Sequence, residues 1–583
     1  MSEIRLRKIK VKNYRSFGEE QNFDFPDKEY KKPISIIGYN NSGKTNLMNA
    51  ILYGIGEQFV SANTFEKTDL HNLDIEKQIE IKTRIEASNY SVWSDYHHRN
   101  VEKTIAGVHT IKTTYEDNEL NAKAEPSFFG ANKHYNIFYI NFHNIKEEIS
   151  TKKTSWGNLT SFLAKHIKSI VDNDAVMTAK KEAFKTSTRE ATEEVLNNSQ
   201  LSSFIAKIKE NYSQNLRNNN CEVEFGLPDY EDIFLQMVFK IGLNGNIDNL
   251  IPIEHFGDGY ISMFVMAVIQ AIAESNVDDK CLFLFEEPES FLHENHQEYF
   301  YKMVLCTLAE KGHQVIYTTH SDRMIDLFDT KSIIRIDFDE QEKRTLKKYN
   351  NINDFNSENE EIISIVNFNS FIKSVEPNIN KTLFSRKVLL VEGPNDLLAY
   401  NFAIEKKIND IKDDIKFSKT YLNFKNITIV VHHGKATALL LIELCKHFGI
   451  DYYAINDWDF NLDFINALAV INTEAELKES QLYLTENGEN RSATRKGMVT
   501  TNWKLIKTAN IDKIHFNIPK LEDVLGYEPI DKSSLGIWKR LNEIPEFNNL
   551  FFPESLTNFL EINELAENNI PDIPDEQAND LPF

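Results

Sequence analysis

Carboxylates follow two apolar segments in the C-terminal half of the chain. The stretch LLVEGPNDLLAY leads from Leu389 into Glu392, and DYYAINDWDFN carries Asp457 and Asp459. Residues two apart in a strand point to the same side, so the two aspartates converge if strand geometry continues through them. Side chains at neighbouring strand ends would then form an all-oxygen pocket, the ligand set that Mg²⁺ and Mn²⁺ prefer. We therefore expect Glu392, Asp457 and Asp459 to bind metal and to catalyse phosphodiester chemistry.

A divalent ion at such a site would polarise the scissile phosphate and lower the pKa of an attacking water. Two ions about 3.5 to 4 Å apart could also stabilise the leaving oxygen, and the pattern leaves open whether one or two are bound. Metal bridging would also let a protein of formal net charge -23 hold an acidic substrate. The adjacent residues His432, His433 and Lys435 stay unassigned, because neighbouring histidines alternate between the faces of a strand.

A phosphate-binding pattern lies near the start of the chain, in ISIIGYNNSGKTNLMNAILYGI. It has the spacing GxxxxGK[ST], follows an apolar strand and opens a helix, so backbone N–H groups can surround the phosphates. We expect the lysine to neutralise the β- and γ-phosphates and the threonine to hold Mg²⁺. The residues predicted to bind ATP here are Gly38, Asn40, Asn41, Ser42, Gly43, Lys44 and Thr45.

Two further segments could complete an ATPase site. KCLFLFEEPESFLHEN predicts a buried strand that ends at Glu286 and Glu287, where α/β sheets place their ligands. Glu286 could hold the Mg²⁺ shell while Glu287 orients and deprotonates the attacking water. HQVIYTTHS predicts another buried strand, which ends at His320 within reach of a γ-phosphate.

The order of these signals resembles the ABC-type ATPases that include the RecF and SMC proteins, over roughly residues 1 to 340. The resemblance makes EEPESFLHEN the Walker B motif with the D-loop and His320 the switch histidine. It places Gly257, Asp258 and Gly259 of HFGDGYIS at the signature position that contacts nucleotide across a dimer. Arg15 of NYRSF matches an N-terminal nucleotide contact. Glu286 stands where many members have aspartate, and no glutamine is assigned to the Q-loop.

Residues 385 to 530 resemble the TOPRIM domain of topoisomerases, DnaG-type primases and certain nucleases. The resemblance implies that Asp396 is a metal ligand, since an acidic residue often follows the Glu-Gly pair in those nucleases. It also implies a late acidic ligand in PKLEDVLG, either Glu522 or Asp523, with Glu522 our choice. The basic stretch RSATRKG and Lys520 are candidate phosphate contacts or solvated loops.

An ABC-type ATPase followed by a TOPRIM domain resembles the OLD (overcoming lysogenization defect) family of ATP-binding nucleases. The resemblance implies an ATP-regulated endonuclease dependent on Mg²⁺ or Mn²⁺, with DNA expected rather than RNA. It further implies a role in defence against phage, a homodimer or higher assembly, and an accessory protein or nucleic acid. Whether ATP activates or restrains cleavage stays open. The rival hypotheses are a noncatalytic ATP-switched clamp and a TOPRIM polymerase or topoisomerase.

The elements that must position these residues suggest an α/β protein of several domains, because 583 residues exceed one usual core. Strand-like segments near both ends of the chain are separated by a Lys-, Glu- and Ala-rich segment with helical spacing. We expect an ATPase N-terminal lobe at 1–150, a helical insertion for dimerisation at 151–245, an ATPase C-terminal lobe at 246–375, a TOPRIM domain at 380–560 and a solvated acidic tail at 561–583.

Composition limits the classes of function. Hydrophobic content of 41% and charged content of 26% are those of ordinary globular proteins. The net charge of -23 argues against a protein that coats nucleic acid with its whole surface. Four scattered cysteines exclude a zinc ribbon and fit a reducing compartment. Without a membrane-length apolar run or a signal peptide, we expect a soluble cytoplasmic protein.

Overall fold

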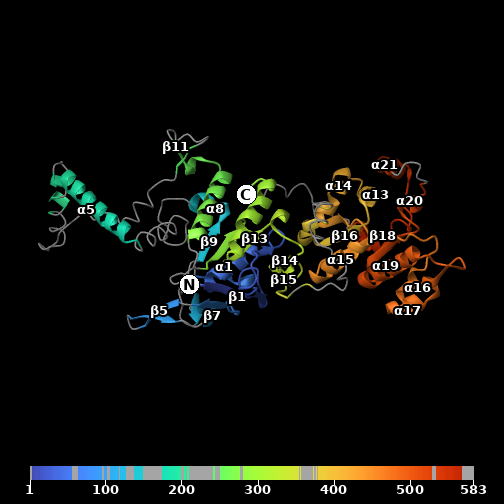
Figure 1. The fold of residues 1–583 in the computed structure, drawn as a ribbon, viewed down its shortest axis with the longest axis horizontal. Coiled ribbons are helices and arrows are strands. Elements are labelled where there is room, and N and C mark those ends of the chain that lie inside the picture. The colour runs from blue at the N-terminus through green and yellow to red at the C-terminus, as the bar shows by residue number, and fades with distance from the viewer. Residues whose placement is uncertain are drawn as a thin grey trace. The chain divides into compact units, whose positions relative to one another are not determined.

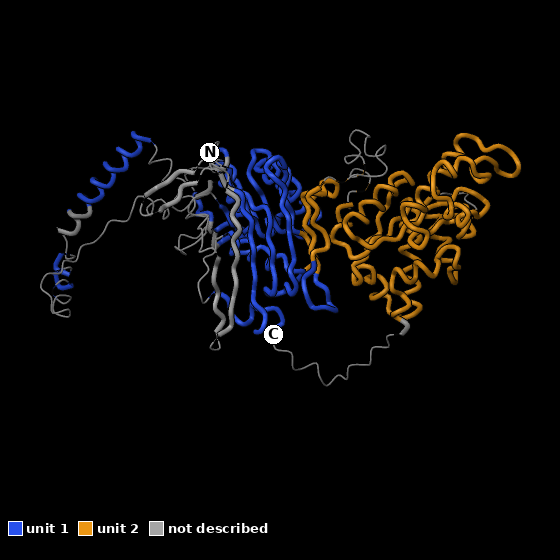
Figure 2. The backbone as a smooth tube through the Cα atoms, turned by 90° about the horizontal axis from the view of Figure 1, so that it is seen from below, with its two compact units in different colours: residues 1–36, 41–324, 338–346 blue, residues 37–40, 325–337, 347–583 orange. Residues whose placement is uncertain are grey.

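The computed structural model describes most of the chain, and its contacts divide it into two compact units (Figure 2). The first unit comprises residues 1–36, 41–324 and 338–346, and the second comprises residues 37–40, 325–337 and 347–583. The described residues are 3–55, 64–88, 90–94, 97–101, 105–116, 119–125, 137–148, 174–197, 202–204, 206–208, 210, 240–242, 250–275, 280–353, 355, 372, 376, 379–527 and 533–567.

An antiparallel sheet of order β2-β1-β4-β7-β8 opens the first unit. The alternation of core-facing residues shifts by one position inside β1, because a β-bulge lies between Leu6 and Lys8. Ile4 and Leu6 are buried before the bulge, and Ile9 and Val11 are buried after it. One extra residue thus restores the apolar face of the sequence to the core. The strands are β1 (Glu3–Lys12), β2 (Gln21–Asp24), β4 (Glu80–Ser88), β7 (Ile105–Glu116) and β8 (Glu119–Glu125).

A six-stranded sheet of order β15-β14-β3-β13-β12-β9 carries the nucleotide motifs. β12 pairs in parallel with β13 and with β9, and all five of its residues are buried, as its continuous apolar run predicts. Helix α1 (Lys44–Ile55) follows β3, and α8 (Asp258–Ser275) packs on the core beside β9 and β12. The strands are β3 (Ile34–Ile37), β9 (Ile137–Asn141), β12 (Leu282–Glu286), β13 (Gln314–Thr319), β14 (Ile333–Asp339) and β15 (Arg344–Asn350).

The helical segment expected between the lobes is partly described. Helix α5 (Ala175–Asn197) is long, and its described side chains are mostly exposed. The helical pattern LTSFLAKHIKSIVDN at 159–173 lies outside the described residues. The polar stretch at 350–361 is the linker that the sequence predicts, and only its residues 350–353 and 355 are described. The other elements of the first unit are α3 (Ile145–Glu148), β5 (Tyr90–Ser94), β6 (His97–Val101), β10 (Lys240–Gly242), β11 (Leu250–Pro252), α9 (Glu294–Phe300), a π-helix at Tyr301–Cys306 and α10 (Thr307–Glu310).

The second unit is built on a parallel sheet of order β17-β16-β18-β21. Alternate residues of its strands enter two separate cores: Leu390 and Ala454 lie in one, and Leu389 and Ile455 in the other. Each face is therefore covered, with α15 and α19 on one side and α13 and α14 on the other (Figure 1). The strands are β16 (Lys387–Val391), β17 (Ile427–Val431), β18 (Asp451–Asp457) and β21 (Ile514–Asn517).

Short helices fill the rest of the second unit. All four strands of the sheet run the same way, so their carboxyl ends meet at one edge, and the acidic motifs lie there. The helices are α13 (Pro394–Lys412), α14 (Ile415–Phe424), α15 (Lys435–His447), α16 (Ile465–Ala469), α17 (Glu474–Glu479), α18 (Gln481–Leu484), α19 (Ala493–Ala509), α20 (Leu521–Val524), α21 (Ser534–Glu543), α22 (Glu554–Phe559) and α23 (Ile562–Glu567), with a hairpin of β19 (Thr485–Glu486) and β20 (Glu489–Asn490).

The first two residues of the acidic tail are not solvated, which corrects the expectation for residues 561 and 562. Glu561 lies 2.7 Å from Arg386, 2.9 Å from Lys387 and 2.8 Å from Lys425, measured between charged atoms. These contacts lower the pKa of its carboxyl, although burial opposes them. Ile562 joins the core, so one carboxylate and one apolar residue hold this segment in place. Residues 568–583 lie outside the description.

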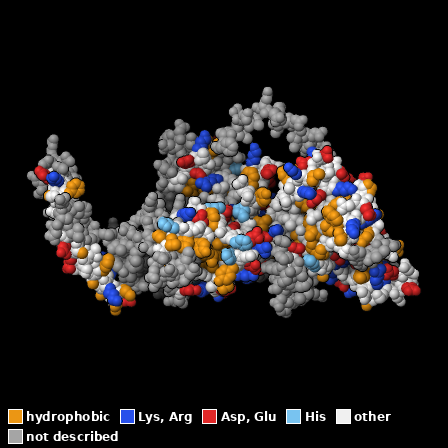
Figure 3. Space-filling view, turned by 90° about the horizontal axis from the view of Figure 1, so that it is seen from above, with side chains coloured by type: hydrophobic (Ala, Val, Ile, Leu, Met, Phe, Trp, Pro, Cys, Tyr) orange, Lys and Arg blue, Asp and Glu red, His pale blue; other side chains and the backbone are white. Residues whose placement is uncertain are grey.

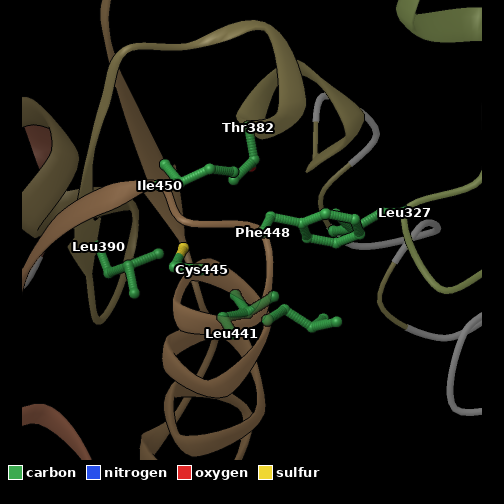
Figure 4. Close-up of a pocket in the computed structure, with 8 residues that line it drawn as sticks. Leu327, Thr382, Leu390, Leu441, Cys445, Phe448 and Ile450 are labelled. Carbon is green, nitrogen blue, oxygen red and sulfur yellow. The ribbon is translucent and has the colours of Figure 1, made fainter. Parts of the chain in front are cut away.

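An apolar pocket in the second unit is separate from the acidic motifs. Buried Leu390, Leu441, Cys445 and Phe448 help to line it, and Thr382 is its polar member (Figure 4). Without a carboxylate or a cation in its lining, it offers no group for phosphate chemistry. The described surface carries charges of both signs among apolar side chains (Figure 3). Among the described helices, none has the length and apolarity to cross a membrane.

Candidate active sites

The loop after β3 is shaped for phosphate by its tight glycine. Gly43 has φ +99°, and a Cβ there would lie 2.5 Å from Thr345 Oγ1 and 2.7 Å from Ser16 Oγ. Thr345 Oγ1 also lies 2.8 Å from the carbonyl oxygen of Ser42, which fixes the loop. Glycine is therefore required at 43 both by conformation and by space.

Helix α1 begins at Lys44, so its N-terminus faces the loop where phosphates are expected. Lys44 is buried and Thr45 is exposed at this end of the helix. Arg15 has φ +49°, and its Nε donates to Asp69 Oδ1 at 2.8 Å, which fixes its direction. Among the other predicted contacts, Gly38 is buried, while Asn40 and Asn41 are exposed.

The two Walker B glutamates have protein donors. Tyr139 Oη donates to Glu286 Oε2 at 2.7 Å. Glu287 Oε1 lies 3.1 Å from His320 Nε2, and its Oε2 lies 2.6 Å from His143 Nε2. The hydrogen bond from His320, with a smaller contribution from His143, lowers the pKa of Glu287 against the effect of burial. Both oxygens of this carboxylate are thus held by imidazoles.

A third glutamate of the same motif holds the loop that carries His320. Glu289 Oε1 accepts hydrogen bonds from Thr319 Oγ1 at 2.7 Å and from the backbone N of His320 at 2.6 Å. Burial raises the pKa of Glu289. Glu289 therefore joins the Walker B loop directly to the end of β13, which fixes the backbone position of His320. The sequence analysis assigned no role to Glu289.

The signature-like segment begins α8 beside the D-loop. A Cβ on Gly259 would approach the carbonyl oxygen of Phe291 to 2.9 Å, so the close contact requires glycine. Gly257 has no atom within 4 Å of a built Cβ. Asp258 is the first residue of α8 and pairs with Lys146 at 3.0 Å.

In the second unit, Glu392 and Asp457 lie at adjacent strand ends and are tied together. β16 and β18 are paired in parallel, and the backbone N of Asp457 donates to Glu392 Oε2 at 2.8 Å. Asp457 Oδ1 accepts from the backbone N of Leu521 at 2.9 Å. Burial, then the charges of Asp396 and Glu392, raise the pKa of Asp457 to about 8. Burial also raises the pKa of Glu392.

Asp396 occupies the first turn of α13 and faces the same group. Its Oδ2 accepts from the backbone N of Gly393 at 3.0 Å, while its buried Oδ1 has no hydrogen-bond partner. Burial, then the charges of Glu392 and Glu522, raise its pKa to about 7. Glu522 thus lies near enough to act on Asp396, whereas Asp523 is exposed. This favours Glu522 as the late acidic residue.

Asp459 does not continue the strand. β18 ends at Asp457, and Asp459 has φ +67°, so the two side chains do not converge by strand alternation as expected. Asp459 Oδ2 instead lies 2.5 Å from Lys435 Nζ, and its carbonyl oxygen accepts from Arg495 at 2.7 Å. Its charge still reaches Asp457 and Glu392, whose pKa values it raises.

The acidic residues fit a divalent cation by their chemistry. The donor set is all oxygen, one buried carboxylate oxygen has no hydrogen-bond partner, and two carboxyls have pKa values raised by burial and by neighbouring carboxylates. Among the described residues, however, no three His, Cys, Asp or Glu side chains are already arranged to hold an ion. Metal binding by this group would therefore require side-chain movement.

The candidate phosphate contacts in RSATRKG have other partners. Arg491 and Arg495 both pair with Glu486, at 2.8 and 2.6 Å, and Arg495 lies 4.1 Å from the centre of the Phe460 ring. These guanidinium groups therefore hold the loop after Asp459 in place. His432 is fully buried next to Gly434, where burial lowers its pKa to about 4 and keeps it neutral.

Two residues that the sequence analysis overlooked, His143 and Tyr139, contact the Walker B glutamates. The signal that could have found them is the apolar strand YNIFYINF, which predicts a neighbour of β12 and leaves His143 just beyond its end. Lys435, which has no role in the sequence analysis, pairs with Asp459, 24 residues later in the chain.

Comparison with known proteins separates two parts. Residues 5–325 match the family model "AAA ATPase domain", and residues 383–459 match "Overcoming lysogenization defect protein-like, TOPRIM domain". The chain is 23% identical over 440 residues to "Endonuclease GajA" of Bacillus cereus (strain VD045), covering 72% of this chain and 70% of that protein. It is 23% identical over 577 residues to "Old nuclease" of Escherichia phage P2, covering 92% of each.

A solved SMC head domain of Pyrococcus furiosus, bound to the C-terminal domain of ScpA, matches with TM-score 0.31 and 14% identity. The alignment covers 59% of this chain and 95% of that one. The α/β fold class expected from the sequence, an ATPase domain followed by a TOPRIM domain, is confirmed by the two family matches and by the parallel sheets. The chain therefore belongs to the OLD family, with an AAA ATPase domain followed by an OLD-like TOPRIM domain.

Proposed function

We propose that this protein is an ATP-regulated nuclease that needs Mg²⁺ or Mn²⁺ to cut nucleic-acid phosphodiesters. The observation that carries the proposal is the group of buried carboxylates at the carboxyl edge of the TOPRIM sheet, whose pKa values are raised first by burial and then by the charges of one another. Repulsion of this kind is relieved by a divalent cation. The names of two relatives, "Endonuclease GajA" and "Old nuclease", support the same activity.

Glu392, Asp396, Asp457, Asp459 and Glu522 would hold the metal. When bound, a divalent ion polarises the scissile phosphate and lowers the pKa of the attacking water. The chain orients its ligands through backbone donors, from Asp457 to Glu392 and from Leu521 to Asp457.

Lys435 and Asp459 form an ion pair beside the proposed metal ligands. If Asp459 helped to hold a metal, the Lys435 ammonium would be free to offset the charge of a bound phosphate. The hydrogen bond from Arg495 to the carbonyl oxygen of Asp459 would keep the backbone in place while the Asp459 side chain turns.

ATP would bind at Gly38, Asn40, Asn41, Ser42, Gly43, Lys44 and Thr45, with Thr45 and Glu286 holding Mg²⁺ and Glu287 receiving the proton of the attacking water. Arg15 and His320 would contact the nucleotide, and Gly257 and Gly259 would contact the nucleotide of a second subunit. We further propose DNA as the substrate, a cytoplasmic homodimer, dimerisation through the helical insertion, and a role in phage defence with an accessory partner.

The test is cleavage of plasmid, single-stranded DNA and RNA by the full chain in Mg²⁺ or Mn²⁺, with and without ATP. We expect cleavage that Asp457→Ala abolishes while ATP binding survives, and the exposed Asp512→Ala serves as the matched control. Unchanged cutting by Asp457→Ala would refute the assignment. ATP-dependent binding without cleavage in either metal would instead favour the noncatalytic clamp.

A further inference from the structure

The end of β9 supplies one donor to each Walker B glutamate. β9 and β12 are parallel neighbours in which Asn141 is the register partner of Glu286. Residues just beyond Asn141 therefore lie beside Glu287. Tyr139 contacts Glu286, and His143 contacts Glu287, so this strand end completes the acidic pair from one side.

The carboxylate of Glu287 is held between two imidazoles. His143 Nε2 lies 2.6 Å from Oε2, and His320 Nε2 lies 3.1 Å from Oε1. An ionised carboxylate only accepts hydrogen bonds, so each contacting nitrogen carries a proton. Each oxygen keeps a second lone pair, so a water can still bind to the carboxylate.

The backbone supports the same arrangement. Glu287 has φ +46°, which is uncommon for a residue with a side chain, and its N donates to Thr318 Oγ1 at 3.1 Å. The backbone N of His143 donates to Asn141 Oδ1 at 3.0 Å, which holds the start of this turn. The His143 side chain is 55% exposed, so its contact with Glu287, and not core packing, is what it contributes.

We propose that His143 is a positioning residue for ATP hydrolysis, acting with His320 to fix both oxygens of Glu287 towards the attacking water. The inference rests on the proposed ATPase function. In that reaction the water oxygen bonds to the γ-phosphorus as the bond from γ-phosphorus to the β–γ bridging oxygen breaks. ADP leaves with the bridging oxygen, and the water proton passes to Glu287. Without His143, Glu287 can rotate about its side chain and lose the aligned geometry.

The test is steady-state ATP hydrolysis by the full chain with His143→Ala, His143→Gln and the control His296→Ala, whose exposed ring lies on α9. We expect His143→Ala to lower kcat by about 10- to 100-fold with KM for ATP within about twofold. His143→Gln should recover at least part of kcat, because its amide can donate to the same oxygen. The control should match the unaltered protein.

A second arm places the effect on Glu287. In a Glu287→Gln background, His143→Ala should cause no further loss, since the group that it positions is gone. Equal kcat in the unaltered protein and His143→Ala would overturn this inference alone, and so would an additive loss in the Glu287→Gln background. No hydrolysis by the unaltered protein would overturn the ATPase function as well, whereas the nuclease proposal is judged separately by cleavage.

Discussion

Two groups of carboxylates stand at strand ends in this molecule, and the protein treats their charges in opposite ways. In the ATPase domain, Glu287 is held by two histidines, which lower its pKa. In the TOPRIM domain, Asp457 and Asp396 face further carboxylates and have pKa values raised to about 8 and about 7. The first group carries its compensation within the chain, while the proposed function gives the second group a cation from outside.

This difference matches the chemistry that each site would perform. A carboxylate that orients water needs a fixed direction, which paired hydrogen bonds supply. A metal site needs unsatisfied oxygens that gain from binding, and the unpartnered Oδ1 of Asp396 is such an oxygen. Glu561 is a third case, with three cations around one carboxylate, so its charge is compensated within the chain.

The largest effect should come from two variants, each of which inactivates one of the two sites. Asp457→Asn should lower the cleavage rate by more than about 100-fold and leave ATP hydrolysis within about twofold, because the metal ligand is lost and the ATPase domain is untouched. Glu287→Gln should lower ATP hydrolysis by a similar factor. Both rates are measured on the same preparations. Loss of both activities in either variant with the fold intact would show that the two sites are not separable in this way.

Removal of metal should make stability depend on pH. Asp396 and Asp457 have folded-state pKa values raised above the ordinary value near 4, so the folded state binds more protons than the unfolded state between about pH 4 and 8. In EDTA the Tm of the TOPRIM unit should therefore fall as pH rises through this window. Mg²⁺ should raise Tm more at pH 8.5 than at pH 5.5.

Calorimetric scans at several pH values measure this effect, with Asp512→Asn as a control that keeps the pH dependence. Asp457→Asn should flatten it. A Tm that rises between pH 5.5 and 8.5 in EDTA would contradict the uncompensated charges of the TOPRIM group.

Glu561→Gln tests the carboxylate whose charge is balanced by three cations of the chain. Removing this charge leaves Arg386, Lys387 and Lys425 facing one another, so we expect a loss of about 2 kcal/mol in the free energy of unfolding. The loss should be the same with and without Mg²⁺. Glu564→Gln is the matched control, because Glu564 lies 3.6 Å from Lys425 and is largely exposed. Denaturant titration should show little change for the control. An equal effect of both variants would contradict the stabilising role of Glu561.

The smallest effect has the opposite sign. Asp396→Asn keeps an acceptor for the N–H of Gly393 but removes one of the repelling charges, so it should stabilise the metal-free protein at pH 8.5 by about 1 kcal/mol. In excess Mg²⁺ the gain should shrink, because a ligand is lost. Asp410→Asn, at an exposed position of the same helix, should change neither value. Destabilisation of the metal-free protein by Asp396→Asn would contradict the account.

The sequence predicts most of the frame in which these groups stand. Short apolar runs locate β3, β12, β16 and β18 because buried parallel strands need apolar side chains on both faces. The acidic residues at their ends follow from the motifs. What the sequence does not predict is which polar side chains meet across the sheet. His143 and Tyr139 lie far from the Walker B motif along the chain and reach it only through strand pairing.

Local backbone conformation limits prediction in the TOPRIM group as well. The spacing of Asp457 and Asp459 suggests a shared strand face, but the turn at Asp459 and its pairing with Lys435 depend on the position of α15. In the tail, a run of acidic residues looks solvated in the sequence, while the three cations that bind Glu561 come from residues 386 to 425.

We propose that the TOPRIM carboxylates bind a divalent cation. The most direct measurement is a calorimetric titration of the nucleotide-free full chain with Mn²⁺ at pH 8, beside Asp457→Asn and Glu286→Gln. We predict saturable binding that Asp457→Asn abolishes and Glu286→Gln leaves unchanged. Absence of binding to the unaltered protein, or binding that survives Asp457→Asn unchanged, would contradict the claim.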